Sequence, residues 1–164
     1  MARITNNTTG TQPITLIDTT AITGNGVGSN SVITLTGVEN ITIENSTGVH
    51  TYTTFSDVDM RKLTTPANNT IKLHIIIDST SFYPVSGATA NSAQAIGLQA
   101  LSSNKDLIYF KIYTAGDSGA TGSNKFVSGQ GFISSLAPTT SPTAPILTTP
   151  LDIQVDGSFS FGSE

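Results

Sequence analysis

The chain has 164 residues, of which 37% are apolar, and it carries a formal net charge of −4 at pH 7 with a pI near 4.9. Its length suits one domain with a real core, whereas its acidic balance excludes a firm grip on nucleic acid, which needs Lys and Arg against phosphate. The absence of Cys excludes disulfides, thiolate metal sites and Cys nucleophiles, and no stretch approaches the roughly 20 apolar residues of a membrane span.

Alternation of apolar and polar residues predicts strands in the first part of the chain. Residues 1–12 are polar and unpatterned, so we expect a flexible N-terminal arm there, and they lack the apolar run of a signal peptide. Residues 13–17 are a short strand candidate, which a Gly-rich turn at residues 24–28 follows. Over residues 31–44 a period of two puts Ile33, Leu35, Ile41 and Ile43 on one face and Thr34, Thr36, Thr42 and Glu44 on the other.

Residues 45–66 form a long polar stretch. A loop of this length is uncommon inside a compact domain and usually has a function. We interpret it as a long loop between subunits, and a projecting hairpin that packs against a neighbour is one form it could take.

One helix and two further strands are predicted in the middle of the chain. Residues 70–78 indicate a strand, because β-branched and aliphatic residues dominate them. An apolar stripe at helical spacing then predicts one amphipathic helix from Thr89 to Ser102, capped by Thr89 or Asn91. Residues 106–114 favour a further strand.

The last third indicates a strand, a turn and a strand. Residues 125–136 favour a strand, and residues 137–145 favour an irregular turn, because three prolines are expected to prevent regular pairing there. Residues 151–161 close the chain with strict alternation.

Ser and Thr make up roughly 28% of the chain, and only 11% is charged against a usual share of about 25%. The sequence therefore predicts a single, mainly β domain over residues 1–164 with one flanking helix.

The sequence offers little for catalysis or metal binding. Its two histidines lie in the polar stretch and in a strand, and no Ser sits in a G-x-S-x-G elbow. The spaced carboxylates, Asp57 with Asp59 and Asp152 with Asp156, lack the dense run of oxygen ligands of a cation loop. Without Trp, the aromatic residues favour core and subunit contacts over a carbohydrate platform. We predict a protein that is not an enzyme and needs no metal or cofactor.

The C-terminal third resembles the end of bacteriophage major tail tube proteins. Residues 131–138 read G-F-I-S-S-L-A-P and match the G-x-x-x-S-L-x-P strand of that family. Residues 154–157 read Q-V-D-G and match the end of the family's final strand. With the polar turn between them, these motifs cover roughly a fifth of the chain. The remainder agrees in layout: strands, one helix in the middle, a long loop and no Cys.

The resemblance implies a barrel-like β-sandwich flanked by one helix. In the family, six copies close into a ring, and their inner sheets join into one multimeric β-barrel around a channel. Rings stack into a hollow tube, with the long loop and the N-terminal arm bridging to adjacent rings. DNA passes through the tube into the host. The resemblance thus implies a structural subunit of a virion tail, assembled in the host cytoplasm, with sheath, tape measure and tail terminator proteins as partners.

Two sets of residues are candidates for this role. A strand face rich in Thr and carboxylates would line a channel that repels phosphate, so that DNA passes without specific binding. The candidate lumen-facing acids are Glu39, Glu44, Asp152 and Asp156. The candidate inter-ring residues of the long loop are His50, Tyr52, Phe55, Asp57, Asp59, Arg61 and Lys62, whose charges favour salt bridges between subunits.

Two other classes of β-rich protein fit the same sequence. One is a different virion component, such as a fibre or a baseplate module. The other is a carbohydrate-binding β-sandwich, which low charge and abundant Ser and Thr also suit. Formation of rings or tubes would separate a tail tube subunit from a monomeric carbohydrate-binding domain.

Overall fold

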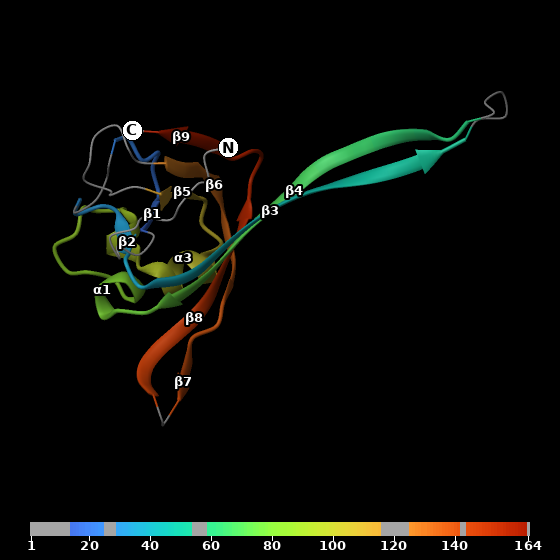
Figure 1. The fold of residues 1–164 in the computed structure, drawn as a ribbon. Coiled ribbons are helices and arrows are strands. Elements are labelled where there is room, and N and C mark those ends of the chain that lie inside the picture. Colours follow the sequence, from blue (N-terminus) through green and yellow to red (C-terminus); the bar gives the residue numbers. More distant parts are fainter. Residues whose placement is uncertain (1–13, 25–28, 54–58, 116–124, 142–143, 164) are drawn as a thin grey trace.

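A computed structural model of the chain describes residues 14–24, 29–53, 59–115, 125–141 and 144–163. Through them run the strands β1 (Thr15–Asp18), β2 (Ile33–Leu35), β3 (Val38–Tyr52), β4 (Arg61–Ile76), β5 (Ile108–Ala115), β6 (Lys125–Leu136), β7 (Thr139–Ser141), β8 (Ala144–Val155) and β9 (Ser160–Ser163). Three short helices, α1 (Ser79–Phe82), α2 (Ala93–Ile96) and α3 (Leu98–Asn104), lie between β4 and β5 (Figure 1). The described chain is mainly β, as the sequence predicts.

The strands form one antiparallel sheet. Its order is β2-β1-β5-β6-β8-β4-β3, with β7 paired to β8 and β9 paired to β6. Although β2 and β3 stand at opposite ends of this order, only Thr36 and Gly37 separate them in the chain. The Ile76 amide donates to the Gly37 carbonyl at 2.7 Å. Because only two residues link β2 to β3, the sheet curls enough to bring the end of β2 beside the start of β3. The expected sandwich is corrected to one curled, open sheet, because hydrogen bonds link all of the described strands.

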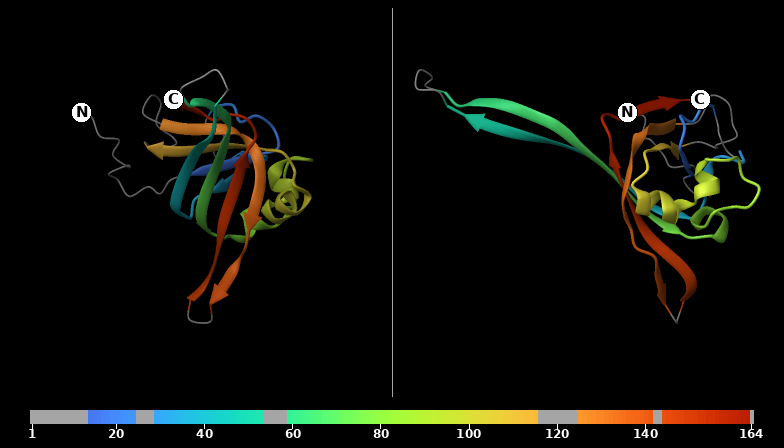
Figure 2. Two further views of the ribbon diagram at one scale, coloured as in Figure 1. Left: turned by 90° about the vertical axis from the view of Figure 1, so that its right-hand side faces the viewer. Right: turned by 180° about the vertical axis from the view of Figure 1, so that it is seen from behind.

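The core lies inside the curl of the sheet. Side chains alternate along each strand, so every second residue points inward. Phe110 on β5 is among the largest of the fully buried side chains. Leu98 and Leu101 of α3 belong to the same cluster, and the helices cover the core from one side (Figure 2). The strand members of this cluster include Ile17, Ile33, Ile71, Leu73, Ile75, Ile108, Ile112, Val127, Ile133, Leu151 and Ile153.

The single helix predicted over residues 89–102 is wrong in its extent. Gly97 separates α2 from α3 with a φ of 82°, a conformation that residues with a Cβ rarely adopt. Ser92 caps α2, in place of the expected Thr89 or Asn91, because its side chain accepts a hydrogen bond from a backbone amide of α2. Two short helices, α2 and α3, thus replace the single predicted helix, and α1 is a further short helix that the sequence analysis does not predict.

Two hairpins extend from opposite ends of the sheet (Figures 1 and 2). Strands β3 and β4 pair out to Tyr52 opposite Arg61, whereas β8 accompanies β4 only as far as Thr70. Beyond Thr70, β3 and β4 continue as a two-stranded projection. At the other end, β8 continues past the end of β4 and pairs with β7 alone. Because β4 and β8 are antiparallel, the two projections point away from each other along the sheet.

Two predicted irregular segments are strands. Residues 45–66, expected as a long loop or a projecting hairpin, belong mostly to β3 and β4, so the hairpin form is confirmed. Residues 137–145, expected to be unpaired, include β7 and the start of β8, with Thr139 opposite Thr148. Prolines are tolerated there because this hairpin lies at the margin of the sheet.

Some predictions fall outside the described residues. These are the N-terminal arm at residues 1–12 and most of the turn at residues 24–28. Among the helices that the structure describes, none is long and apolar enough to cross a membrane.

Candidate assembly surface

The outer side of β3, β4 and β8 is polar. On β4 every second side chain from Ile71 to Ile75 is buried in the core, so those between them point outward. The register places Thr70 opposite Gln154 and Lys72 opposite Asp152 on β8. We name this surface the polar face, and it comprises Glu39, Thr42, Glu44, Thr70, Lys72, His74, Asp152 and Gln154.

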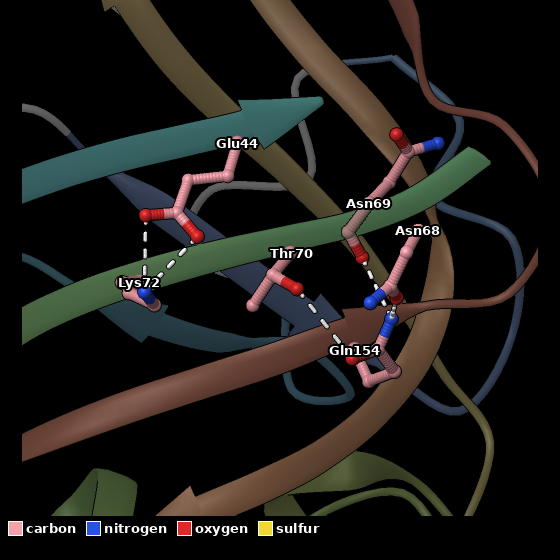
Figure 3. Close-up of polar contacts among 6 residues, drawn as sticks. All are labelled: Glu44, Asn68, Asn69, Thr70, Lys72 and Gln154. Atoms are coloured by element: carbon pink, nitrogen blue, oxygen red, sulfur yellow. Dashed lines mark hydrogen bonds and ion pairs between the residues drawn. The ribbon is translucent and has the colours of Figure 1, made fainter. Parts of the chain in front are cut away.

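Basic side chains lie beside two of the acids on the polar face. Lys72 Nζ lies 3.0 Å from both carboxylate oxygens of Glu44 (Figure 3). His74 Nδ1 lies 2.6 Å from Glu39 Oε2. The four side chains are 45–49% exposed, so each pair contributes at most about 1 kcal/mol to folding. Two of the predicted acids therefore stand beside basic side chains, and the polar face has mixed charge.

The other two predicted acids differ in their surroundings. Asp152 is half-buried on β8, in register with Lys72. Asp156 follows the end of β8, where its Oδ2 accepts a hydrogen bond from Gln130 Nε2 at 3.3 Å and its amide donates to the Gln130 carbonyl at 2.9 Å. The structure thus brings three of the four acids to one face and places Asp156 beside β6. That any of them faces a channel stays a prediction.

A cluster of amides fixes the point where β3 and β4 leave the body of the chain, which is the curled sheet with its core and helices. Gln154 Nε2 donates to Asn68 Oδ1 at 2.6 Å and to the Asn69 carbonyl at 3.0 Å (Figure 3). The Thr70 hydroxyl donates to Gln154 Oε1 at 3.5 Å. Asn69 is buried, and its Nδ2 donates to the Gly157 carbonyl at 3.2 Å. These bonds tie β4 to β8 and to the turn that follows it, so the base of the projection is anchored.

The projection itself is exposed at every described position. We name residues 46–53 and 59–68 the arm. Large apolar side chains on it are 41–73% exposed: Val49, Tyr52, Met60 and Leu63.

The arm contains most of the predicted inter-ring residues. These are His50, Tyr52, Asp59, Arg61 and Lys62, whereas Phe55 and Asp57 lie outside the described residues. Tyr52 lies directly opposite Arg61, and His50 lies opposite Leu63. Sequence reasoning missed Val49 and Leu63, although they are isolated apolar residues in a polar stretch. Contact of the arm with another subunit stays a prediction.

A cavity of about 540 Å³ lies between β5, β6 and the turn after β8. Tyr109, Gln130 and Asp156 are among its described lining residues, which include no His. Lys111 also lines it, but its buried Nζ donates to the Gly24 carbonyl at 2.6 Å and lies 4.1 Å from the centre of the Phe126 ring. Across the described ranges, no three His, Cys, Asp or Glu side chains gather to hold a metal ion.

Comparison with known proteins finds similarity in structure and none in sequence. No protein-family model matches the chain, and no curated protein matches it. A chain in the tail of an empty GTA particle, refined helically with C6 symmetry, is 13% identical with a TM-score of 0.56, over 90% of this chain and 95% of that one. A chain in the virion of a native gene transfer agent (GTA) particle is 14% identical with a TM-score of 0.52, over 80% and 89%.

A third similar structure comes from a baseplate. A chain in the six-fold symmetrised baseplate of the anti-feeding prophage (AFP) is 6% identical with a TM-score of 0.50, over 99% of this chain and 97% of that one. At these identities the likeness establishes the fold. The chain shares its overall fold with chains found in tail, virion and baseplate assemblies.

Proposed function

We propose that this chain is a structural subunit of a phage-like tail and that it forms the tail tube. The observation that carries the proposal is the polar face, a sheet surface of hydroxyl, amide and paired charged groups opposite the core. An antiparallel sheet takes this form where one side packs and the other meets water. The fold shared with a chain of a C6-symmetric tail supports the same function.

We base ring closure on the exposed edge of the sheet at β3. Strand β3 is 15 residues long and ends the strand order, with β4 as its only strand partner among the described residues. Such an edge presents backbone donors and acceptors to any other chain and invites aggregation. Six copies that pair through their sheet edges would satisfy these groups in a closed ring. The polar faces would then join into one multimeric β-barrel.

In this arrangement the polar face lines the channel. Lys72 and His74 stand beside Glu44 and Glu39, so each of these two basic side chains has a carboxylate nearby that weakens its attraction for the phosphates of passing DNA. Asp152 adds negative potential, and the threonines add neutral hydroxyls. The acidic, hydroxyl-rich lumen expected from the sequence stays a prediction, and in this arrangement Lys72 and His74 would lie among its carboxylates and hydroxyls. DNA passes without specific binding because few phosphate contacts form.

Stacking uses the two ends of the subunit. The arm leaves one end of the sheet and the β7–β8 hairpin leaves the other, so a ring would present arms on one face and hairpins on the opposite one. Residues 1–12 would add a second bridge between rings. Inside a virion tail, the tape measure protein would occupy the channel, and terminator and sheath proteins would meet the end and outside of the tube.

A baseplate ring is the second candidate function. The likeness to the AFP baseplate chain, which covers 99% of this chain, favours it. A baseplate ring occurs once in a tail, whereas tube rings repeat. The two functions therefore differ in whether rings of this chain stack on one another.

Labelling of single cysteines tests which surface lines the channel. The natural chain has no Cys, so Thr42→Cys on the polar face and Ser103→Cys on α3 each give one reactive thiol. We expect a small maleimide to label both in the unassembled chain. In assemblies collected by sedimentation, a large polyethylene glycol maleimide should label only the α3 thiol. Equal labelling of both thiols in the assemblies would contradict a lumen lined by the polar face.

A further inference from the structure

Strand β6 has a free edge along its second half. On one side β5 accompanies β6 only as far as Gly131, which pairs with Ile108 at the start of β5. On the other side β8 stays paired with β6 as far as Leu136. Among the described strands, none pairs with residues 132–136 on the side that β5 leaves open. We name this side the β6 edge. Such an edge presents backbone donors and acceptors to any other extended chain.

The Lys105 side chain covers part of the β6 edge. Lys105 lies between α3 and β5 in the chain, so it approaches β6 from the side that β5 leaves open. Its Nζ donates to the Ile133 carbonyl at 3.1 Å. Ile133 also pairs with Ile153 of β8, which lies on the opposite side of β6. A backbone acceptor that a further strand would use is therefore already occupied.

The backbone of Lys105 has a conformation that does not suit a lysine. Its φ of 59° and ψ of 38° are left-handed, and its amide donates to the Leu101 carbonyl at the end of α3. Gly is the usual residue after a helix in this conformation, because a Cβ makes it costly. The end of the helix therefore does not explain a lysine here. The hydrogen bond of its side chain to Ile133 gives it a different role.

We propose that Lys105 protects the β6 edge of the unassembled chain from pairing with another strand. A strand that approaches this edge, from a second copy or from a different protein, must first displace the Lys105 side chain from the Ile133 carbonyl. Lysine at a strand edge is a known means of preventing such pairing. The long edge on β3 is different, because residues 38–52 include no Lys or Arg. The inference goes beyond the proposed function, because it concerns the free subunit and holds for any extended partner.

Lys105→Met tests the protection directly. Methionine is unbranched like lysine but has no ammonium group to donate, so the Ile133 carbonyl becomes available. We expect the protein concentration at which half of the chain is associated to fall about tenfold, the effect of one hydrogen bond to a charged group. Analytical ultracentrifugation over a dilution series measures this concentration.

Lys125→Met is the matched control. Lys125 is exposed on the same strand, but β5 and β9 pair with it on both sides through Ala115 and Ser163. Both substitutions remove one positive charge from an acidic chain, which increases repulsion between copies and by itself disfavours association. We expect Lys125→Met to change the half-association concentration by less than about twofold.

Two further variants separate protection of the edge from a structural role. Lys105→Gly relieves the left-handed backbone, so its urea midpoint should equal or exceed that of the wild type, whereas Lys105→Met should lower the midpoint. Protection of the edge predicts that both variants associate at lower concentration. Lys105→Arg keeps a cation that can donate to Ile133 and should associate as the wild type does. Circular dichroism checks that each variant folds.

Each outcome decides the proposal. Equal effects of Lys105→Met and Lys125→Met would overturn it, and so would a Lys105→Met variant that needs a higher concentration to associate. Unchanged association of Lys105→Gly would show that Lys105 acts only on the local backbone. If the wild-type chain forms no tubes, the proposed function fails by itself. The protection of the edge is then upheld if the Met and Gly variants associate where the wild type does not, and it is overturned if they stay monomeric at their highest soluble concentration.

Discussion

Asp78 begins α1 by accepting hydrogen bonds from the first turn of the helix. Its Oδ1 accepts from the amides of Thr80 at 2.9 Å and Ser81 at 2.8 Å, and both hydroxyls also donate to its carboxylate. Partial burial raises the pKa of Asp78, but these four hydrogen bonds together outweigh burial and hold the pKa below its usual 3.8. The folded chain therefore favours the ionised carboxylate.

We expect Asp78→Ala to lower the free energy of unfolding by about 1 kcal/mol at pH 7, because it removes an N-cap. Since the folded pKa is depressed, the stabilisation by ionised Asp78 is complete above its usual pKa of 3.8 and is lost as pH falls through the folded value. Urea unfolding at pH 7 and near pH 2 should show the difference from wild type shrinking at the lower pH. Asp78→Asn, which caps without titrating, serves as the control. A difference that is the same at both pH values would contradict the assignment.

Gln154 holds the base of the arm through hydrogen bonds to Asn68 and Asn69. We expect Gln154→Ala to destabilise the chain by about 1–2 kcal/mol, because the Asn69 carbonyl loses its donor in a half-buried setting. The exposed Asn68→Ala removes only the acceptor of one of these bonds and should cost less than about 0.5 kcal/mol. Urea unfolding of both variants measures the contrast, and equal costs would rule out an anchoring role for Gln154.

At the scale of elements, we expect the arm to contribute to assembly rather than to folding stability. Its described residues are all exposed, so the core loses no contact when the arm is removed. Replacing residues 47–67 by Asn-Gly joins Ser46 to Asn68, which already face each other, through a two-residue turn. We expect the free energy of unfolding to change by less than about 0.5 kcal/mol, measured by urea unfolding, while stacking is abolished. Loss of folding would show that the arm stabilises the body.

The strands were predictable because their chemistry repeats locally. Ile71 to Ile75 on β4 and Leu151 to Val155 on β8 alternate strictly with polar residues, and the structure buries the apolar set. The prediction of a single helix over residues 89–102 was wrong because the apolar stripe includes Gly97. The positive φ and tight packing of Gly97 end one helix and start another. Periodicity cannot report a backbone conformation that tertiary packing selects.

The arm was harder to predict for a different physical reason. A strand that is exposed on both sides carries no apolar alternation, so residues 45–66 have the composition of a loop. Their pairing continues the register of β3 and β4 beside the core, where Ile41 faces Leu73 and Ile43 faces Ile71. The ion pairs of the polar face were equally hidden, because they join residues 28 and 35 positions apart. Register decides such contacts, and register follows from the whole sheet.

At the scale of the whole molecule, the main feature is that the two sides of the sheet differ from each other, and so do its two ends. One side of the sheet packs a core against short helices, and the other presents the polar face. One end of the sheet carries the arm, and the other carries the β7–β8 hairpin. A subunit with distinct sides and distinct ends is suited to an assembly that closes around an axis and repeats along it.

Electron microscopy of the purified full-length chain at high concentration tests this assembly most directly. We expect hollow tubes of stacked rings with six-fold symmetry in end-on views, and single rings from the variant with residues 47–67 replaced. A chain that stays monomeric under these conditions, or that forms closed particles without a channel, would contradict a tail tube subunit.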